Sequence, residues 1–132
     1  MAGSVPFSYI GSGGNLVNVT GILRLENDDL FLSFRKADPF MLGRKLPLKE
    51  VRIPLTQVDA LEFLNNRILF HVRLRLRVRK LEFLDPVPGS DGAEIVLWCR
   101  RRYRPIANEL ANLVTIQILE RVFPDEKHSV GA

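Results

Sequence analysis

The sequence predicts a mainly β domain, with about seven antiparallel strands in a bent sandwich or barrel and one C-terminal α-helix. Short runs rich in β-branched and aromatic residues alternate with turn-forming residues along most of the chain. Apolar and polar residues, most of the latter arginines, alternate without a break over residues 70–79. After Pro105, apolar residues recur at helical spacing instead. Together these patterns indicate an all-β body followed by a single helix.

Length and composition are those of one globular domain. The chain has 132 residues, of which 46% are hydrophobic and 26% charged, so it can bury one core. We expect a flexible N-terminal segment over residues 1–15, a single domain over 16–123 and a flexible tail over 124–132. The formal charge of +4 and the pI near 9.6 favour acidic partners, such as lipid headgroups, nucleic acid or an acidic protein surface.

The cysteine content and the N-terminal residues indicate the cellular compartment of the protein. The single cysteine, Cys99, cannot form an internal disulfide, which suits a reducing compartment, and its alternation with apolar neighbours predicts a small core residue. Residues 1–14 carry neither the cationic nor the apolar region of a signal peptide, and no run approaches the length of a membrane span. We therefore expect a cytoplasmic protein, either free or peripheral to the inner face of a membrane.

Turn-forming residues divide the chain into its predicted strands. A short polar turn at residues 26–29 joins two β-rich runs in a hairpin, and Asn65 with Asn66 marks a later turn. Residues 36–48 contain proline and glycine and predict a long connection, and residues 85–92 are a loop by every local signal. The strands expected from these boundaries cover residues 19–25, 30–35, 51–55, 58–64, 67–79, 81–84 and 94–100.

The alternating segment separates core from charge. Successive side chains of a strand point to opposite faces, so one set is expected in the core and the other outside. The apolar set is Val72, Leu74, Leu76 and Val78, and the cationic set is Arg73, Arg75, Arg77 and Arg79. At the usual strand rise the arginines span about 20 Å, which is wide enough to meet an anionic surface. Residues 67–84 exceed the usual strand length, so we expect a bend near Lys80.

The last element is predicted to be a helix over residues 105–122, ended by Pro124. Its first half places apolar residues on one side: Ile106, Leu110, Leu113 and Val114. Its second half carries apolar residues nearly all round: Ile116, Ile118, Leu119, Val122 and Phe123. Either the N-terminal segment covers this half, or the half forms a subunit contact. Propensity alone also allows a strand over residues 114–118.

The order of elements resembles the pleckstrin-homology-like superfamily, particularly its GRAM-type and bacterial branches. The segments that carry the resemblance are Gly21-Ile22-Leu23-Arg24-Leu25, Asp29-Leu30-Phe31-Leu32 and Arg52-Ile53-Pro54-Leu55, within residues 16–123. The resemblance implies that the helix plugs one end of a bent antiparallel sheet, and that the domain serves protein or membrane-surface contacts. Phosphoinositide-binding members carry basic residues at the first hairpin loop, whereas residues 26–29 are acidic, which argues against inositide recognition in that mode.

Patterns for catalysis or metal binding do not emerge. His71 and His128 stand apart from any cysteine or carboxylate at metal-ligand spacing. The glycine-rich residues 11–14 lack the Lys-Ser or Lys-Thr pair of a phosphate loop and are interpreted as a linker. Three acids are expected to answer the arginines from neighbouring strands: Glu62, Glu82 and Glu94. We therefore expect no catalytic residue, metal, cofactor or small-molecule substrate.

These observations favour a non-enzymatic interaction module that mediates protein–protein contact or self-association. The apolar second half of the helix and the apolar residues of the long connection motivate this hypothesis. The residues expected at the apolar interface are Ile116, Leu119, Phe123, Phe40 and Met41.

The alternative is peripheral binding to an anionic membrane surface or another anionic ligand. Each basic residue near an anionic surface contributes on the order of 1 kcal/mol. The residues expected at this site are Arg73, Arg75, Arg77, Arg79, Arg101 and Arg102. Binding of single-stranded nucleic acid is the least favoured function, because it needs aromatic platforms for base stacking and the polar face of the arginine strand carries no aromatic residue at all.

Overall fold

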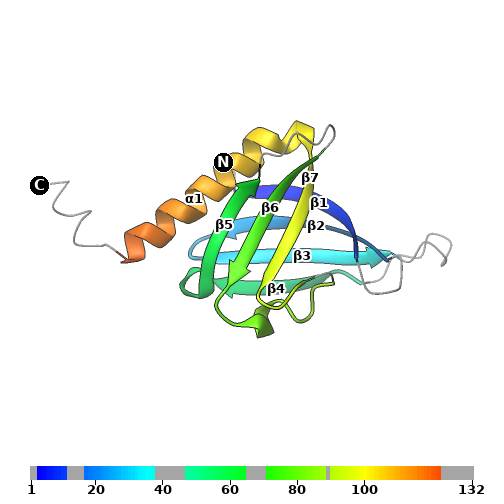
Figure 1. The fold of residues 1–132 in the computed structure, drawn as a ribbon, viewed down its shortest axis with the longest axis horizontal. Helices are drawn as coiled ribbons and strands as arrows, with labels where there is room; N and C mark the ends of the chain where they lie inside the picture. Colours follow the sequence, from blue (N-terminus) through cyan, green and yellow to red (C-terminus); the bar gives the residue numbers. More distant parts are fainter. Residues whose placement is uncertain (1–2, 12–16, 38–46, 65–70, 89, 123–132) are drawn as a thin grey trace, which may run out of the picture.

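The computed structural model describes residues 3–11, 17–37, 47–64, 71–88 and 90–122. Within these residues the chain forms seven antiparallel strands in two sheets and one C-terminal helix (Figure 1). The first sheet consists of β1 (Ser4–Gly11), β2 (Val17–Glu26), β3 (Asp29–Ala37) and β4 (Lys49–Pro54). The second sheet consists of β5 (Val58–Leu64), β6 (His71–Val78) and β7 (Glu94–Arg100). The remaining elements are α1 (Arg104–Val122) and three short 3₁₀ segments, η1 (Leu55–Gln57), η2 (Leu81–Phe83) and η3 (Arg101–Tyr103).

The two sheets form a sandwich. In Figure 1 the strands of the second sheet run steeply across those of the first. β1 also lies against β7, but hydrogen-bonded pairing stays within each sheet, so the sheets are not closed into a barrel. The predicted mainly β class with a C-terminal helix is confirmed.

The core lies between the sheets and follows the alternation along each strand. On β6 the apolar set predicted from the sequence is buried, with each side chain at most 3% exposed. On β7 the buried side chains are Ile95, Leu97 and Cys99. Burial raises the pKa of the Cys99 thiol to about 12, because the thiolate would lose its hydration. The predicted core position of Cys99 is therefore confirmed.

Helix α1 contacts both layers through its first half. It packs against β5, β1 and η1 with side chains at helical spacing: Ala107, Leu110, Ala111 and Val114. Near its other end, Arg121 Nη2 lies 2.7 Å from Asp28 Oδ1 in the turn between β2 and β3. The helix prediction is confirmed and the alternative of a strand over residues 114–118 is wrong. Among the described residues, no helix combines the length and hydropathy needed to cross a bilayer.

The first difference from prediction is at the N-terminus. Residues 1–15 were expected to be flexible, yet Ser4–Gly11 is β1 and pairs with β2 along its whole length. The reason is a short alternation between the glycines, which buries Val5 and Phe7. The polar turn at residues 26–29 is consequently the second turn of the sheet rather than the first. Asn27 adopts a φ of 56° there, a conformation that asparagine tolerates.

The second difference follows the arginine strand. Residues 81–84 were expected to be a strand, but β6 ends at Val78 and Leu81–Phe83 is a 3₁₀ turn. This turn brings Leu84 and Val87 into the core, which replaces the burial that a strand would have given. Residues 38–46, which include the predicted contacts Phe40 and Met41, lie outside the described residues, as do Phe123 and the predicted tail over 124–132.

At Gly21, in β2, a side chain has no room. A Cβ there would clash with the backbone oxygen of Ser33 and would lie 2.7 Å from the ring of Phe7. The Phe7 ring is itself 4% exposed and cannot move into solvent without opening the core.

We expect Gly21→Ala to lower the free energy of unfolding by about 1–3 kcal/mol, the usual range for overpacking. Ser8→Ala, at an exposed position of the adjacent strand, serves as the control and should change it by less than about 0.5 kcal/mol. Urea denaturation measures both. An unchanged midpoint for Gly21→Ala would contradict the packing described for this sheet.

Candidate anion-binding face

Strand β6 is the central strand of its sheet, so its outward side chains have neighbours on both sides. We call the outward side chains of β5, β6 and β7 the outer face. Across this face, Arg73 lies between Leu64 and Trp98, Arg75 between Glu62 and Val96, and Arg77 between Ala60 and Glu94. His71 lies opposite Arg100 at one end. Three of the four arginines predicted to share one face of this strand therefore do so, whereas Arg79 follows the end of β6.

Both glutamates of the outer face pair with the same arginine. Arg75 Nε lies 3.0 Å from Glu94 Oε1, and its Nη1 lies 3.8 Å from Glu62 Oε2. The three side chains are 34–44% exposed, so each pair stabilises the fold by only about 0.2–1 kcal/mol. The expectation that neighbouring acids answer the arginines holds for Arg75, whereas Glu82 lies exposed in η2.

Arg73 has a different environment. Its guanidinium carbon lies 5.3 Å from the centre of the Trp98 ring, at cation–π distance. The His71 ring meets the same indole edge-on, with 5.9 Å between ring centres. The buried Nε of Arg73 has no hydrogen-bond acceptor within the described part of the chain. Arg73 thus stands against an aromatic ring and has no carboxylate partner among the residues that the structure describes.

Trp98 is the functional candidate that the sequence interpretation missed. The polar face of the arginine strand was expected to carry no aromatic residue at all, but Trp98 on the neighbouring strand lies directly beside Arg73 on that face. The signal was present, because an inward Cys99 requires an outward Trp98 on the same strand.

The other predicted arginines are distributed over the face and its two ends. Arg77 is half-buried and forms no ion pair with any described residue. Arg79 is exposed beyond the end of β6, where its backbone N–H donates to the carbonyl of Gln57. Arg101 and Arg102 belong to η3, which follows β7 at the opposite end of the sheet, and Arg102 lies 4.8 Å from the Tyr103 ring. The six arginines therefore do not form one continuous patch.

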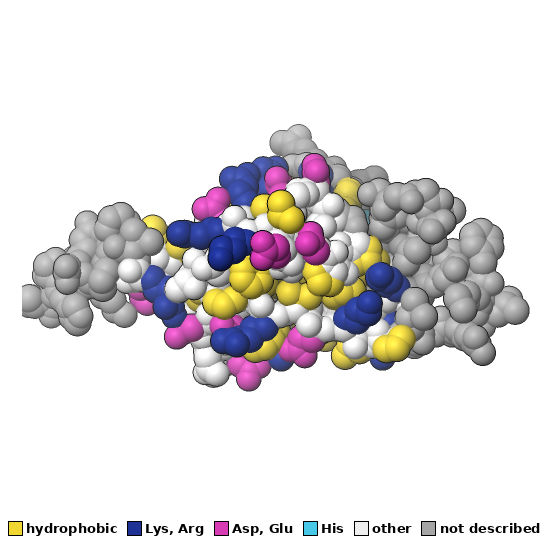
Figure 2. Space-filling view, turned by 90° about the horizontal axis from the view of Figure 1, so that it is seen from below, with side chains coloured by type: hydrophobic (Ala, Val, Ile, Leu, Met, Phe, Trp, Pro, Cys, Tyr) yellow, Lys and Arg dark blue, Asp and Glu magenta, His cyan; other side chains and the backbone are white. Residues whose placement is uncertain are grey.

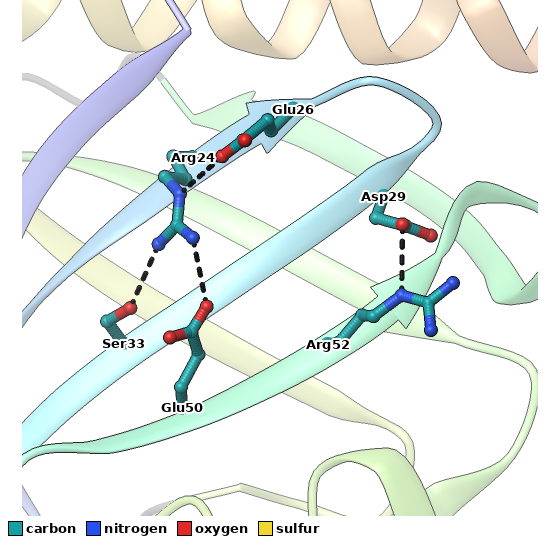
Figure 3. A network of polar contacts seen from close by, with 6 residues as sticks. All are labelled: Arg24, Glu26, Asp29, Ser33, Glu50 and Arg52. Carbon is teal, nitrogen blue, oxygen red and sulfur yellow. Dashed lines mark hydrogen bonds and ion pairs between the residues drawn. The ribbon is translucent and has the colours of Figure 1, made fainter.

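A second polar cluster, on the outer side of the first sheet, is neutralised internally (Figure 3). Arg24 donates to Glu26, Glu50 and Ser33 at 3.1, 2.9 and 3.2 Å. The hydrogen bond to Glu26 raises the pKa of Arg24, and Glu50 adds to the rise. Arg52 Nε lies 2.9 Å from Asp29 Oδ2. With these carboxylates already engaged on its arginines, this cluster is a poor site for an external anion.

The surface seen from below the view of Figure 1 also carries charges of both signs. In Figure 2, Lys and Arg side chains are interspersed with Asp and Glu side chains around exposed hydrophobic ones. Interspersed charges of both signs are typical of an ordinary solvated surface. This face gives no reason to expect a charged partner.

Helix α1 exposes part of the predicted apolar interface. Ile116 and Leu119 are 50% and 51% exposed, three residues apart on one side of the helix, whereas Ile118 is packed against the core.

The described residues contain no cluster of His, Cys, Asp and Glu that could hold a metal ion. No family model, curated protein or solved structure matches this chain.

Proposed function

We propose that this chain is a non-enzymatic interaction module that binds anionic phospholipid surfaces through its outer face. One observation carries the proposal. The two glutamates of this face are both engaged by Arg75, and Arg73 and Arg77 form no ion pair with any described residue. The face therefore carries surplus positive charge that the fold itself does not neutralise.

The architecture supports a pleckstrin-homology-like scaffold. A four-stranded and a three-stranded antiparallel sheet, followed by a helix that packs on both layers, agree with the order of elements that the resemblance implies. The acidic turn at residues 26–29 joins β2 to β3, so it is not the first hairpin loop, and its acidity is no argument about the phosphate-binding loop of that family. The connection between β1 and β2, residues 12–16, lies outside the described residues.

The charge pattern favours a lipid surface over a nucleic acid strand. A nucleic acid backbone that followed β6 would pass between Glu62 on β5 and Glu94 on β7, and both carboxylates would repel it. Lipid headgroups are separate and mobile, so they can gather at the unpaired arginines and leave the acidic middle uncovered. With about 1 kcal/mol for each cation near the surface, binding is expected to be weak and to fall as salt is raised.

We expect the chain to sediment with phosphatidylserine-containing vesicles and not with phosphatidylcholine vesicles. Arg73→Gln, Arg77→Gln should weaken binding roughly five- to thirtyfold, from about 1 kcal/mol for each arginine that lies near the membrane surface. The matched control is Arg52→Gln, Arg121→Gln, which removes the same charge from two arginines paired with Asp29 and Asp28 elsewhere. Equal losses in the two variants, or no preference for anionic vesicles, would refute the proposal.

A second candidate function is self-association through α1. The exposure of Ile116 and Leu119 favours it, because the ion pair of Arg121 with Asp28 holds this part of the helix to the sheet while the apolar side chains face outward.

If two copies pair through this helix face, Ile116→Ser, Leu119→Ser should convert a dimer to a monomer in sedimentation equilibrium. Leu48→Ser, Leu81→Ser is the matched control, since both residues are exposed apolar side chains away from α1. A native chain that is monomeric, or a control variant that dissociates equally, would exclude the helix as the interface.

A further inference from the structure

We infer that lipid phosphate binds at one end of the outer face, which we call the Trp98 corner: His71, Arg73, Trp98 and Arg100. The inference rests on the proposed function and assigns it to a particular part of the face. The corner lies where β6 begins and β7 ends.

The distribution of acids singles out this end. The residues directly across from Arg73 are Leu64 and Trp98, and the residue across from His71 is Arg100. None of them is acidic, whereas the rows of Arg75 and Arg77 each contain a glutamate. Arg100 is exposed, and the chain continues from it into further exposed arginines, Arg102 and Arg104. The corner is therefore the end of the outer face where, among the described residues, the arginines have no carboxylate across from them.

Arg73 can bind a phosphate without breaking an ion pair. Arg75 would have to give up its contacts to Glu62 and Glu94 before it could offer its guanidinium group to a ligand. Arg73 makes only the ring contact with Trp98 among the described interactions, and its Nε has no acceptor there. A phosphate oxygen could therefore accept a hydrogen bond from the accessible part of this half-buried side chain without displacing a carboxylate.

Trp98 gives the corner an apolar component suited to a bilayer surface. Indole rings concentrate at the level of lipid headgroups, where one side of the ring meets the apolar region and the N–H stays hydrated. Trp98 is half-buried, and Leu64 lies in the same row across Arg73. An arginine beside an indole thus matches the charged and the apolar parts of a headgroup region.

The test uses the intrinsic fluorescence of Trp98, because it is the only tryptophan of the chain. Vesicles of phosphatidylcholine with phosphatidylserine should shift its emission to shorter wavelength and protect it from acrylamide, while phosphatidylcholine alone should not. Arg73→Gln and Arg100→Gln should each weaken binding by roughly fivefold or more. Arg77→Gln removes the same charge from the other end of the face and should have a clearly smaller effect. Thermal unfolding of each variant checks the fold, and the exposed Arg100 keeps the test valid if Arg73→Gln does not fold.

The outcomes separate the inference from the proposed function. Sedimentation with anionic vesicles without a change in Trp98 emission, or equal effects of Arg77→Gln and Arg100→Gln, would overturn the corner and leave the proposed function standing. Failure to sediment with either vesicle would overturn both. Tight binding of a single-stranded oligonucleotide that quenches Trp98, with no response to vesicles, would overturn the lipid assignment in favour of nucleic acid.

Discussion

The burial of alternate residues on β6 is the constraint on which the rest of the structure depends. β6 is the central strand of the second sheet, and its four inward side chains are at most 3% exposed between the two layers. A slip of one residue in the register would turn Arg73, Arg75 and Arg77 into the core, at a cost that no local rearrangement could offset. The packing of the core therefore holds the arginines on the outer face.

The fold gains little stability from these arginines. Neighbouring outward positions on a strand are about 6.6 Å apart, so the guanidinium groups repel one another across a short distance. Only Arg75 is relieved by carboxylates, and those half-exposed pairs contribute little. On the first sheet, by contrast, Arg24 and Arg52 both form ion pairs with carboxylates (Figure 3). This contrast is why we assign an external partner to the outer face.

Most of the fold follows from local patterns in the sequence, and the differences have physical causes. The alternation along β6 and the helical spacing after Pro105 were strong enough to predict both elements. β1 was missed because glycines and serines flank a short alternation whose burial depends on pairing with β2. The segment after β6 has strand propensity, but burial of Leu84 and Val87 from a turn prevails over it. The site was predicted as a stripe; its division by Glu62 and Glu94, and the contact with Trp98, depend on strand register, which the sequence alone does not reveal.

We expect Glu62 and Glu94 to limit the anion affinity of the outer face, because both engage Arg75. The most direct measurement is vesicle affinity of the Glu62→Gln, Glu94→Gln variant, compared with Glu50→Gln, Asp29→Asn, which changes the charge equally on the first sheet. We predict that the outer-face variant binds anionic vesicles more tightly than the native chain by at least roughly fivefold, because Arg75 becomes available, and that the control gains much less. Equal gains in the two variants, or no gain in either, would show that Glu62 and Glu94 do not limit anion binding at the outer face.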